Sequence, residues 1–538
     1  MASLQERTGV LGKRLAAHLL RRVTFTPTKA RIDAFAQKTA AQAVAELLIP
    51  AAPHLSEPID PASGSPWINS GIPPVSQNFR LRTYVIAWWL DEARRDISML
   101  SRMSFFLHTV FVTAHEGQST LYFDHISLLR YNALGNFKKF AVRMTYDNLM
   151  LAYLDNTLNN KANPNENYAR ELLELFTIGK GDQVGLGDYT NYTEDDVVQA
   201  ARVLTGIKRA TQRNIVDSET NIPSGYNNFN QHDTGDKTFS HRFNNHVITG
   251  ATNAADMRRE IEDFIDMIYT QAETARYFVR KLYRYFVGRK ITSEIEADVI
   301  EPLATTFSTN NFEIVPVLQQ LFQSQHFYDA DDMLASDEII GNMIKSPLEL
   351  FLGAASLFDI PVPDPSTDPL NHYQNFYNRS ILSVFFPQAG FELFKPSVVA
   401  GYPAYYQIPS YHRNWFNSSS IIARYKLSEI ILTGRRVLAG GGNGGVELNV
   451  TDWVDKNISE PGTARTLVTE FLAYMIPEEA DADRFDYYFN DIFLAGQTEA
   501  DWAYEWGNFT LSGDDTEVKI PISNLITAIM YSPEYQLF

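Results

Sequence analysis

Apolar positions recur at helical spacing along much of this chain, and the clearest case is the run NPNENYARELLELFTIG. At about 100° per residue, Tyr168 and Phe176 fall on one half of a helix, while acidic and amide side chains fall on the other half. Asn163 suits the N-cap position and Gly179 the stop. The pattern therefore predicts a helix over 164–178 with one core face and one acidic face.

The acidic face has two interpretations. Glu166 with Arg170, and Arg170 with Glu174, are i,i+4 pairs that support any solvated helix by about 0.2–0.5 kcal/mol each. Alternatively, Glu166, Arg170, Glu171 and Glu174 line a polar cavity, in which they bind a cation or act as acid and base. A buried Glu174 would need a counterion, and Arg170 is the nearest candidate. Spacing leaves both interpretations open.

The same periodicity, punctuated by cap and stop residues, predicts a mainly α-helical fold: a large multi-helix body with a short β-hairpin excursion and irregular loops. Short β pieces are expected in a hairpin around 237–243, within a polar excursion over 208–246, and near 446–450. Irregular structure is expected over 361–415 and a glycine-rich loop over 439–445. Further helices are expected over 10–50 (two helices), 79–140, 194–206, 256–287, 294–327, 344–358, 415–424 and 452–538.

The length of 538 residues exceeds that of an average domain. We expect residues 1–330 to form a helical core that contains the 164–178 helix. Residues 331–538 are expected to form a C-terminal helical region packed on that core, in an arrangement compatible with a single domain.

The acidic composition narrows the class of partner. The chain has 64 Asp and Glu residues against 46 Lys and Arg residues, which gives a formal net charge of −18. Nucleic acids and anionic lipids bind clustered Lys and Arg, so this balance argues against both partners. Cations, neutral glycans or a basic protein suit the chain better.

The absence of cysteine excludes disulfides, zinc–thiolate sites and a thiol nucleophile. It suits an exported protein, and a periplasmic or extracellular location is favoured. The first 22 residues lack the apolar stretch of a classical signal peptide. No window reaches the roughly 18 uninterrupted apolar residues of a membrane span, so no transmembrane segment is expected.

Two further places offer metal-ligand chemistry. His108 lies within a helical pattern rich in phenylalanine, where a lone histidine also fits an ordinary core position. His232, Asp233 and Asp236 lie within six residues of one another and could supply an imidazole and hard oxygen ligands to a divalent ion. The alternative for this second group is a structural turn, since Asp and Gly favour turns for backbone reasons.

Several motifs together resemble a known bacterial family. They are NPNENYARELLELFTIG, EDDVVQAARVLTG, HLLRRVTFTPT, LRYNALGNFKKFA, QHDTGDKTF and the closing SPEYQLF, and they extend over nearly the whole chain. This set resembles the family called domain of unknown function 1800. The resemblance implies a fold and a set of special positions, without an established reaction.

The resemblance also implies two departures. Family members commonly carry Trp-His-Asn-His-Phe where this chain has Leu107-His108-Thr109-Val110-Phe111, and often a histidine at the position of Phe176. An apolar side chain therefore replaces a histidine at both Val110 and Phe176. The resemblance further places His232 and Asp233 near the 164–178 helix.

Two functions are expected on these grounds. The first is an envelope-associated or extracellular binding or structural partner with a degenerate polar or metal site. Its implied partner is a phosphatase- or sulfatase-like protein, because family members are often encoded beside one. The alternative is a metal-dependent or carboxylate-dependent hydrolase acting on a glycan or a phosphate ester. Its catalytic candidates are Glu166, Arg170, Glu171 and Glu174, and its candidate ligands for a divalent cation are His108, His232, Asp233 and Asp236.

Overall fold

The computed structural model describes residues 2–50, 56–70, 73–114, 117–331, 338–434 and 446–538. Helices dominate these residues, and their strands occur only in short two-stranded antiparallel sheets. The predicted mainly α-helical fold is confirmed. The glycine-rich loop predicted over 439–445 lies outside the described residues.

Residues 10–50 hold three helices where two were predicted. The extra break follows from Thr39 and Gln42, which form a capping box that begins α3. The helices up to residue 153 are α1 (Gly12–Val23), α2 (Lys29–Ala36), α3 (Ala40–Leu47), α4 (Asn78–Arg95), α5 (Leu100–Val110), α6 (Ser119–Asn132), α7 (Phe137–Thr145) and α8 (Asn148–Tyr153).

The middle of the chain follows the predicted helical runs with additional breaks. A capping box of Thr193 and Asp196 begins α10, as predicted. These helices are α9 (Asn167–Glu171), α10 (Glu194–Val203), α11 (Ala254–Tyr269), α12 (Ala272–Phe286), α13 (Ser293–Ile295), α14 (Glu301–Thr309) and α15 (Val315–Phe322).

The C-terminal part is helical as predicted, and Ser346 with Glu349 forms the expected capping box at the start of α16. Its helices are α16 (Pro347–Leu357), α17 (Phe386–Gln388), α18 (Pro403–Tyr406), α19 (Ser420–Thr433), α20 (Val450–Asn457), α21 (Ala464–Met475), α22 (Ala482–Asp486), α23 (Glu499–Ser512) and α24 (Thr516–Tyr531).

Segments of π-helix and of 3-10 helix make up the rest of the helical structure. The prediction of irregular structure over 361–415 is wrong for a 16-residue π-helical segment that buries Phe376 and Ile381. Its asparagines resemble loop residues in the sequence, yet Asn375 donates along the helix to Asn371. The π-helical segments are Leu172–Thr177, Glu296–Ile300, Leu370–Phe385 and Tyr487–Leu494. The 3-10 turns are Val75–Gln77, Asn156–Leu158, Phe229–Gln231, His241–Phe243, His326–Tyr328, Tyr411–Trp415 and Glu534–Gln536.

Four antiparallel pairs account for the strands of the described residues. The predicted hairpin around 237–243 is present, with its second strand a few residues further on. The predicted strand near 446–450 is wrong, because Val450 begins α20 and the Asn449 side chain caps that helix. The pairs are β1 (Ile59–Asp60) with β2 (Ser65–Pro66), β3 (Gln183–Gly185) with β4 (Asp188–Tyr189), β5 (Ile207–Lys208) with β6 (Tyr226–Asn227), and β7 (Lys237–Thr238) with β8 (Val247–Ile248).

The predicted 164–178 helix is correct in place and wrong in its start. It begins at Asn167, three residues after Pro164, and its second half widens into the π-helical segment Leu172–Thr177. Asparagine side chains hold the preceding turn: Asn159 Oδ1 accepts the N–H of Asn165 at 2.9 Å, and Asn165 Oδ1 accepts the N–H of Asn167 at 2.9 Å. Such local side-chain bonds compete with a helical first turn.

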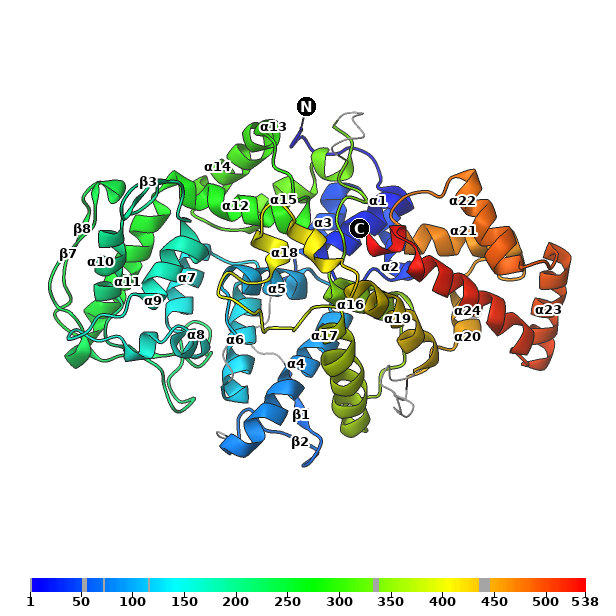
Figure 1. Cartoon of the computed structure of the whole chain (residues 1–538), viewed down its shortest axis with the longest axis horizontal. Coiled ribbons are helices and arrows are strands. Elements are labelled where there is room, and N and C mark those ends of the chain that lie inside the picture. The colour runs from blue at the N-terminus through cyan, green and yellow to red at the C-terminus, as the bar shows by residue number, and fades with distance from the viewer. Residues whose placement is uncertain (1, 51–55, 71–72, 115–116, 332–337, 435–445) are drawn as a thin grey trace.

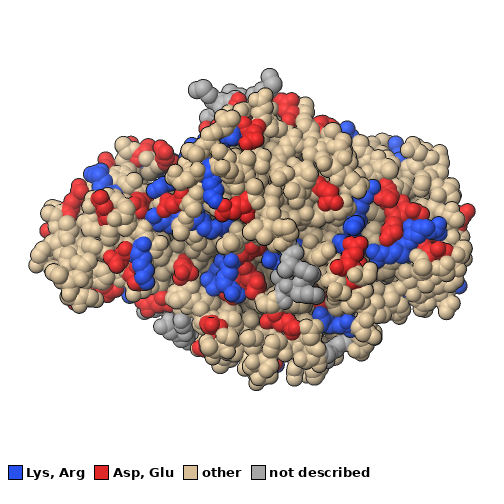
Figure 2. All heavy atoms as spheres, turned by 180° about the vertical axis from the view of Figure 1, so that it is seen from behind, with Lys and Arg blue, Asp and Glu red and all other residues tan. Residues whose placement is uncertain are grey.

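One buried apolar cluster runs from Leu11 to Tyr535 and ties the helices together. Figure 1 shows an elongated molecule with α9–α11 and β7–β8 at one end, α20–α24 at the other, and α1, α5 and α16 between them. On the face seen in Figure 2, Lys and Arg side chains lie beside Asp and Glu side chains instead of gathering into one basic area.

Candidate functional site

Arg170 is the centre of the acidic face of α9. Its guanidinium nitrogens lie 3.1 Å from Glu166 Oε2 and 2.8 Å from Glu194 Oε1, so it joins α9 to the start of α10. The hydrogen bond with Glu194 raises the pKa of Arg170 and lowers that of Glu194. All three side chains are about a third to two fifths exposed. The group is therefore an ion-pair bridge at a solvated edge.

Glu174 has partners other than the expected Arg170. Its Oε2 accepts the Tyr192 hydroxyl at 3.1 Å and lies 3.4 Å from Lys180 Nζ, while Arg170 is engaged elsewhere. Burial and the charge of Glu174 raise the pKa of Tyr192. The Glu174 side chain is 27% exposed, so the acidic face is neither a closed cavity nor free surface.

Glu171 lies on the same partly buried edge. Burial, together with the charge of Glu174, raises the pKa of the Glu171 carboxyl. Two carbonyl groups of the adjoining π-helical segment accept hydrogen bonds from side chains of α12. The Tyr277 hydroxyl donates to Glu174 O at 3.2 Å, and Lys281 Nζ donates to Leu175 O at 2.6 Å. Side chains from α12 thus bond to carbonyl groups of the widened turn, where the i→i−4 hydrogen bonds of the α-helix are interrupted.

His108 is fully buried on α5, away from the acidic face. Neither ring nitrogen has a hydrogen-bond partner among the described residues, and the ring packs 4.9 Å from Phe394. Burial lowers the pKa of His108 well below its usual value, so the ring is neutral. The His125 ring lies 6.2 Å from the His108 ring, measured between centroids.

His125 belongs to a buried pair that the sequence did not reveal. Its Nδ1 lies 3.0 Å from Asp147 Oδ2, and its Nε2 lies 3.3 Å from the Thr113 hydroxyl. Both nitrogens are therefore engaged within the fold. The donors around His108 do not suit a metal, because one imidazole among aromatic rings supplies too few ligands.

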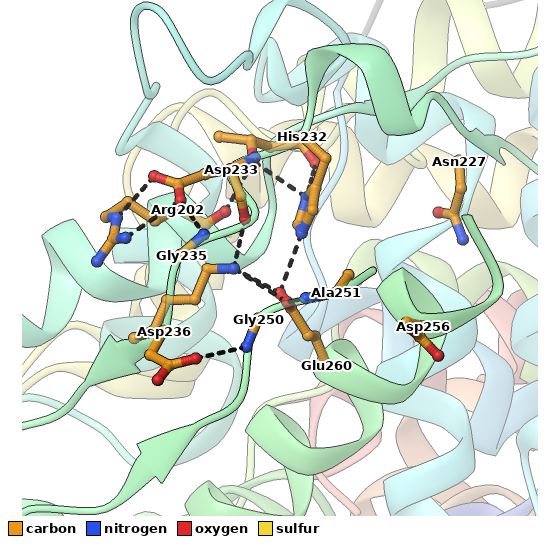
Figure 3. Close-up of polar contacts among 12 residues, drawn as sticks. Arg202, Asn227, His232, Asp233, Gly235, Asp236, Gly250, Ala251, Asp256 and Glu260 are labelled. Carbon is orange, nitrogen blue, oxygen red and sulfur yellow. Dashed lines mark hydrogen bonds and ion pairs between the residues drawn. The ribbon is translucent and has the colours of Figure 1, made fainter. Parts of the chain in front are cut away.

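The His232 region forms a second polar group, shown in Figure 3. His232 Nε2 lies 3.1 Å from Glu260 Oε2, and Nδ1 lies 2.8 Å from the Thr205 carbonyl oxygen. Lys237 Nζ donates to both Glu260 oxygens, at 3.0 and 2.8 Å, and the N–H of Ala251 donates to the same carboxylate. The side chains of His232, Lys237 and Glu260 are fully buried.

The two aspartates beside His232 face other partners (Figure 3). Asp233 forms a two-pronged pair with Arg202 of α10, at 2.8 and 3.1 Å. Burial alone would raise the pKa of Asp233, but the bonds from Arg202 and from the N–H of Gly235 outweigh it and lower the pKa. Asp236 accepts the N–H of Gly250 at 2.9 Å. Each carboxylate therefore fixes a different part of the polar excursion.

The predicted site residues fall into three separate places. The acidic face contacts the start of α10 through Glu194, and the His232 group contacts the end of α10 through Arg202. These two contact points lie roughly 12 Å apart along α10. His108 lies on α5. Across the described residues, no three His, Asp or Glu side chains converge so as to hold a metal ion. The proposed metal and catalytic roles stay predictions.

Sequence reasoning missed the partners that complete these groups. Glu260 and Tyr192 lie 28 and 18 residues from the side chains they contact, and His125 lies 22 residues from Asp147. Pairs between separate elements leave no spacing signal in one sequence. The only sequence signal for the His232–Lys237–Glu260 network was the closeness of Lys237 to His232 and Asp233 in QHDTGDKTF.

Comparisons with known proteins give one match. Neither the curated proteins nor the solved structures include a match to this chain. Within the described ranges, every helix falls short of the length and apolarity that a membrane span requires. A family model described as "Protein of unknown function (DUF1800)" matches residues 18–537. The chain belongs to that family.

Proposed function

We propose that this protein is a non-catalytic binding partner in a bacterial envelope or extracellular assembly, and that it holds a basic protein. The contact we propose is the hairpin surface, which comprises Glu171, Asp182, Val184, Leu186 and Asp195. A basic face of the phosphatase- or sulfatase-like partner implied by the family resemblance would suit this surface. The cysteine-free composition supports an exported location.

One observation carries the proposal: exposed apolar residues form the tip of the β3–β4 hairpin, within an acidic stretch of the chain. Leu186, at the turn between β3 and β4, is fully exposed, and Val184 is 57% exposed. Isolated exposed apolar residues are common, but a pair on a projecting hairpin offers an anchor that a partner can cover. The strands rest on α10, because the N–H of Glu194 donates to Gly187 O at 2.9 Å.

The charge around that tip favours a basic partner. Residues 166–195 hold seven acidic and two basic residues. Both basic residues, Arg170 and Lys180, are already paired with acidic side chains of the same stretch. An apolar tip in an acidic stretch of the chain matches a protein surface with a small pocket and a basic rim, because complementary charge steers association and excludes like-charged partners.

The test compares complexes in cells that produce the protein. We expect the wild-type chain to elute from native size fractionation in a complex heavier than the single chain. Leu186→Asp should return it to the elution position of the single chain, while Leu511→Asp, a matched change at an equally exposed leucine on α23, should leave the complex intact. Wild-type chain that is cytosolic and unbound, or a complex that survives Leu186→Asp, contradicts the proposal.

A second candidate is the hydrolase, with Glu166, Arg170, Glu171 and Glu174 in the catalytic roles. The raised pKa of Glu171 next to Glu174 favours it, because an acid–base pair needs carboxyls of different pKa. The test is hydrolysis of nitrophenyl glycosides and nitrophenyl phosphate, with the metal content measured on the same sample. Turnover that Glu171→Gln abolishes, with about one equivalent of divalent metal per chain, would establish this candidate over the binding role.

A further inference from the structure

The C-terminal end of the molecule carries an open groove that the proposed function does not use. It lies between the π-helical segment Tyr487–Leu494 and α24, and its volume is about 820 Å³. Figure 1 places α22 and α24 at the opposite end of the long axis from β3, so the groove is remote from the hairpin surface. A volume of this size is typical of ligand sites.

Two tyrosine rings stand on opposite walls of the groove. Tyr487 is 49% exposed and Tyr531 is 43% exposed. Tyr531 is held in place because it stacks on Tyr425, with ring centroids 4.7 Å apart and planes at 22°. Tyr487 is supported by the buried Tyr488, whose ring centroid lies 5.3 Å away. The rings are thus pre-positioned and partly free.

The polar lining of the groove is acidic or neutral except for one arginine. Asp483, Asp491, Asn524 and Thr527 supply carboxylate, amide and hydroxyl groups. The one cationic side chain in the lining, Arg484, is paired with Glu534 at 3.3 Å. An anionic ligand would therefore meet no free cation, whereas a ligand rich in hydroxyl groups would meet both donors and acceptors.

The backbone of one wall departs from regular helix. Tyr487–Leu494 is π-helical, and Ala495, which also lines the groove, has a φ of 47°. A non-glycine residue in the left-handed region is strained, and such strain and π-helical turns gather at functional sites. Tyr487 and Asp491, four residues apart on this segment, both line the groove.

From these observations we propose that the groove binds a neutral oligosaccharide. A pyranose ring has an apolar C–H face, which stacks on an aromatic ring, and an edge of hydroxyl groups, which hydrogen-bond to carboxylate and amide side chains. The two tyrosines supply the faces and Asp483, Asp491 and Asn524 supply the edge. Binding of a basic peptide to the same carboxylates is a separate outcome of the test below.

The test is calorimetric titration of the full chain with four neutral hexasaccharides: maltohexaose, cellohexaose, xylohexaose and chitohexaose. We expect at least one to bind with a Kd on the order of 0.1–1 mM, as suits a shallow open site. Tyr487→Ala and Tyr531→Ala should each weaken that binding about tenfold, while Tyr531→Phe should keep it because the stacking face remains. Tyr504→Ala, at a 68% exposed tyrosine of α23, is the matched control and should bind like wild type.

Three results would overturn the proposal. The first is no binding of any of the four sugars at 10-fold the upper limit of the expected Kd. The second is sugar binding that persists unchanged in the Tyr487→Ala/Tyr531→Ala double variant with its circular dichroism spectrum intact. The third is binding of octalysine that Asp491→Asn weakens, without binding of any sugar, which would assign the groove to a basic peptide.

Discussion

At the scale of single residues, Glu260 is the side chain on which the polar excursion depends. Its carboxylate meets Lys237, His232 and the N–H of Ala251 with none of these side chains exposed. Removing its charge leaves the Lys237 ammonium buried and uncompensated, which costs about 3–5 kcal/mol. We expect Glu260→Gln to lower the free energy of unfolding by this amount in guanidinium denaturation.

The matched control for Glu260 lies two residues along α11. Glu262 is 51% exposed and pairs with Arg258 at the surface, so Glu262→Gln should change the free energy of unfolding by less than about 0.5 kcal/mol. Equal effects at the two positions would show that the buried network contributes nothing beyond an ordinary surface pair.

Glu174 tests whether the acidic face is surface or site. It shares one hydrogen bond with Tyr192 while about a quarter of its side chain stays exposed. We expect Glu174→Gln and Tyr192→Phe each to cost about 1 kcal/mol, and the double variant to cost less than their sum, because the first change weakens the hydrogen bond that the second removes. Urea denaturation of the four proteins measures this. Curves that overlay the wild type would make the acidic face ordinary surface.

At the scale of elements, Lys281 couples α12 to the π-helical segment through its bond to Leu175 O. Burial, and then the charge of Arg284, lowers the pKa of Lys281 to about 7. Between pH 7 and 10 the unfolded chain therefore binds a proton at this lysine that the folded protein does not, so the free energy of unfolding rises with pH. Below pH 7 both states are protonated and the contribution is constant.

The variant that isolates this effect is Lys281→Met. We expect wild type to gain about 2 kcal/mol relative to Lys281→Met between pH 7 and pH 9, measured from denaturation midpoints at each pH. Lys456→Met, at a 67% exposed lysine of α20, serves as the background and should track wild type across the range. A wild-type curve parallel to that of Lys281→Met would refute the lowered pKa.

The elements also show what a single sequence can predict. Ser346 with Glu349, and Thr193 with Asp196, began their helices as predicted because a capping box is a contact between residues three apart. The start of α9 was predicted wrongly because the Asn159 side chain accepts a hydrogen bond from the N–H of Asn165, six residues away. The partners of His232 and Asp233 were missed for the same reason at greater separation.

At the scale of the whole molecule, contacts cross the position where the sequence suggested a division near residue 330. Arg21 of α1 donates to Tyr474 O at 2.6 Å and to Ile476 O at 3.0 Å, and buried Arg102 pairs with Glu349. We propose that the parts before and after this position unfold together. Scanning calorimetry should give one transition, and two resolved transitions would separate the parts.

The two proposed surfaces lie at opposite ends of the molecule, because β3 lies at the end that holds α9–α11, and α24 lies at the other end (Figure 1). The hairpin surface is proposed to hold a protein, and the groove beside α24 a neutral sugar. Such an arrangement suits a protein that connects others, because each end can be occupied without disturbing the buried networks.

The measurement that tests the binding role most directly is photo-cross-linking from position 186 in cells that produce the protein. A benzophenone amino acid at Leu186 should give a discrete heavier adduct, and Asp182→Asn with Asp195→Asn should weaken it, while the same probe at exposed Leu511 should give none. Equal adducts from both positions, or none from position 186, would contradict a binding role for the hairpin surface.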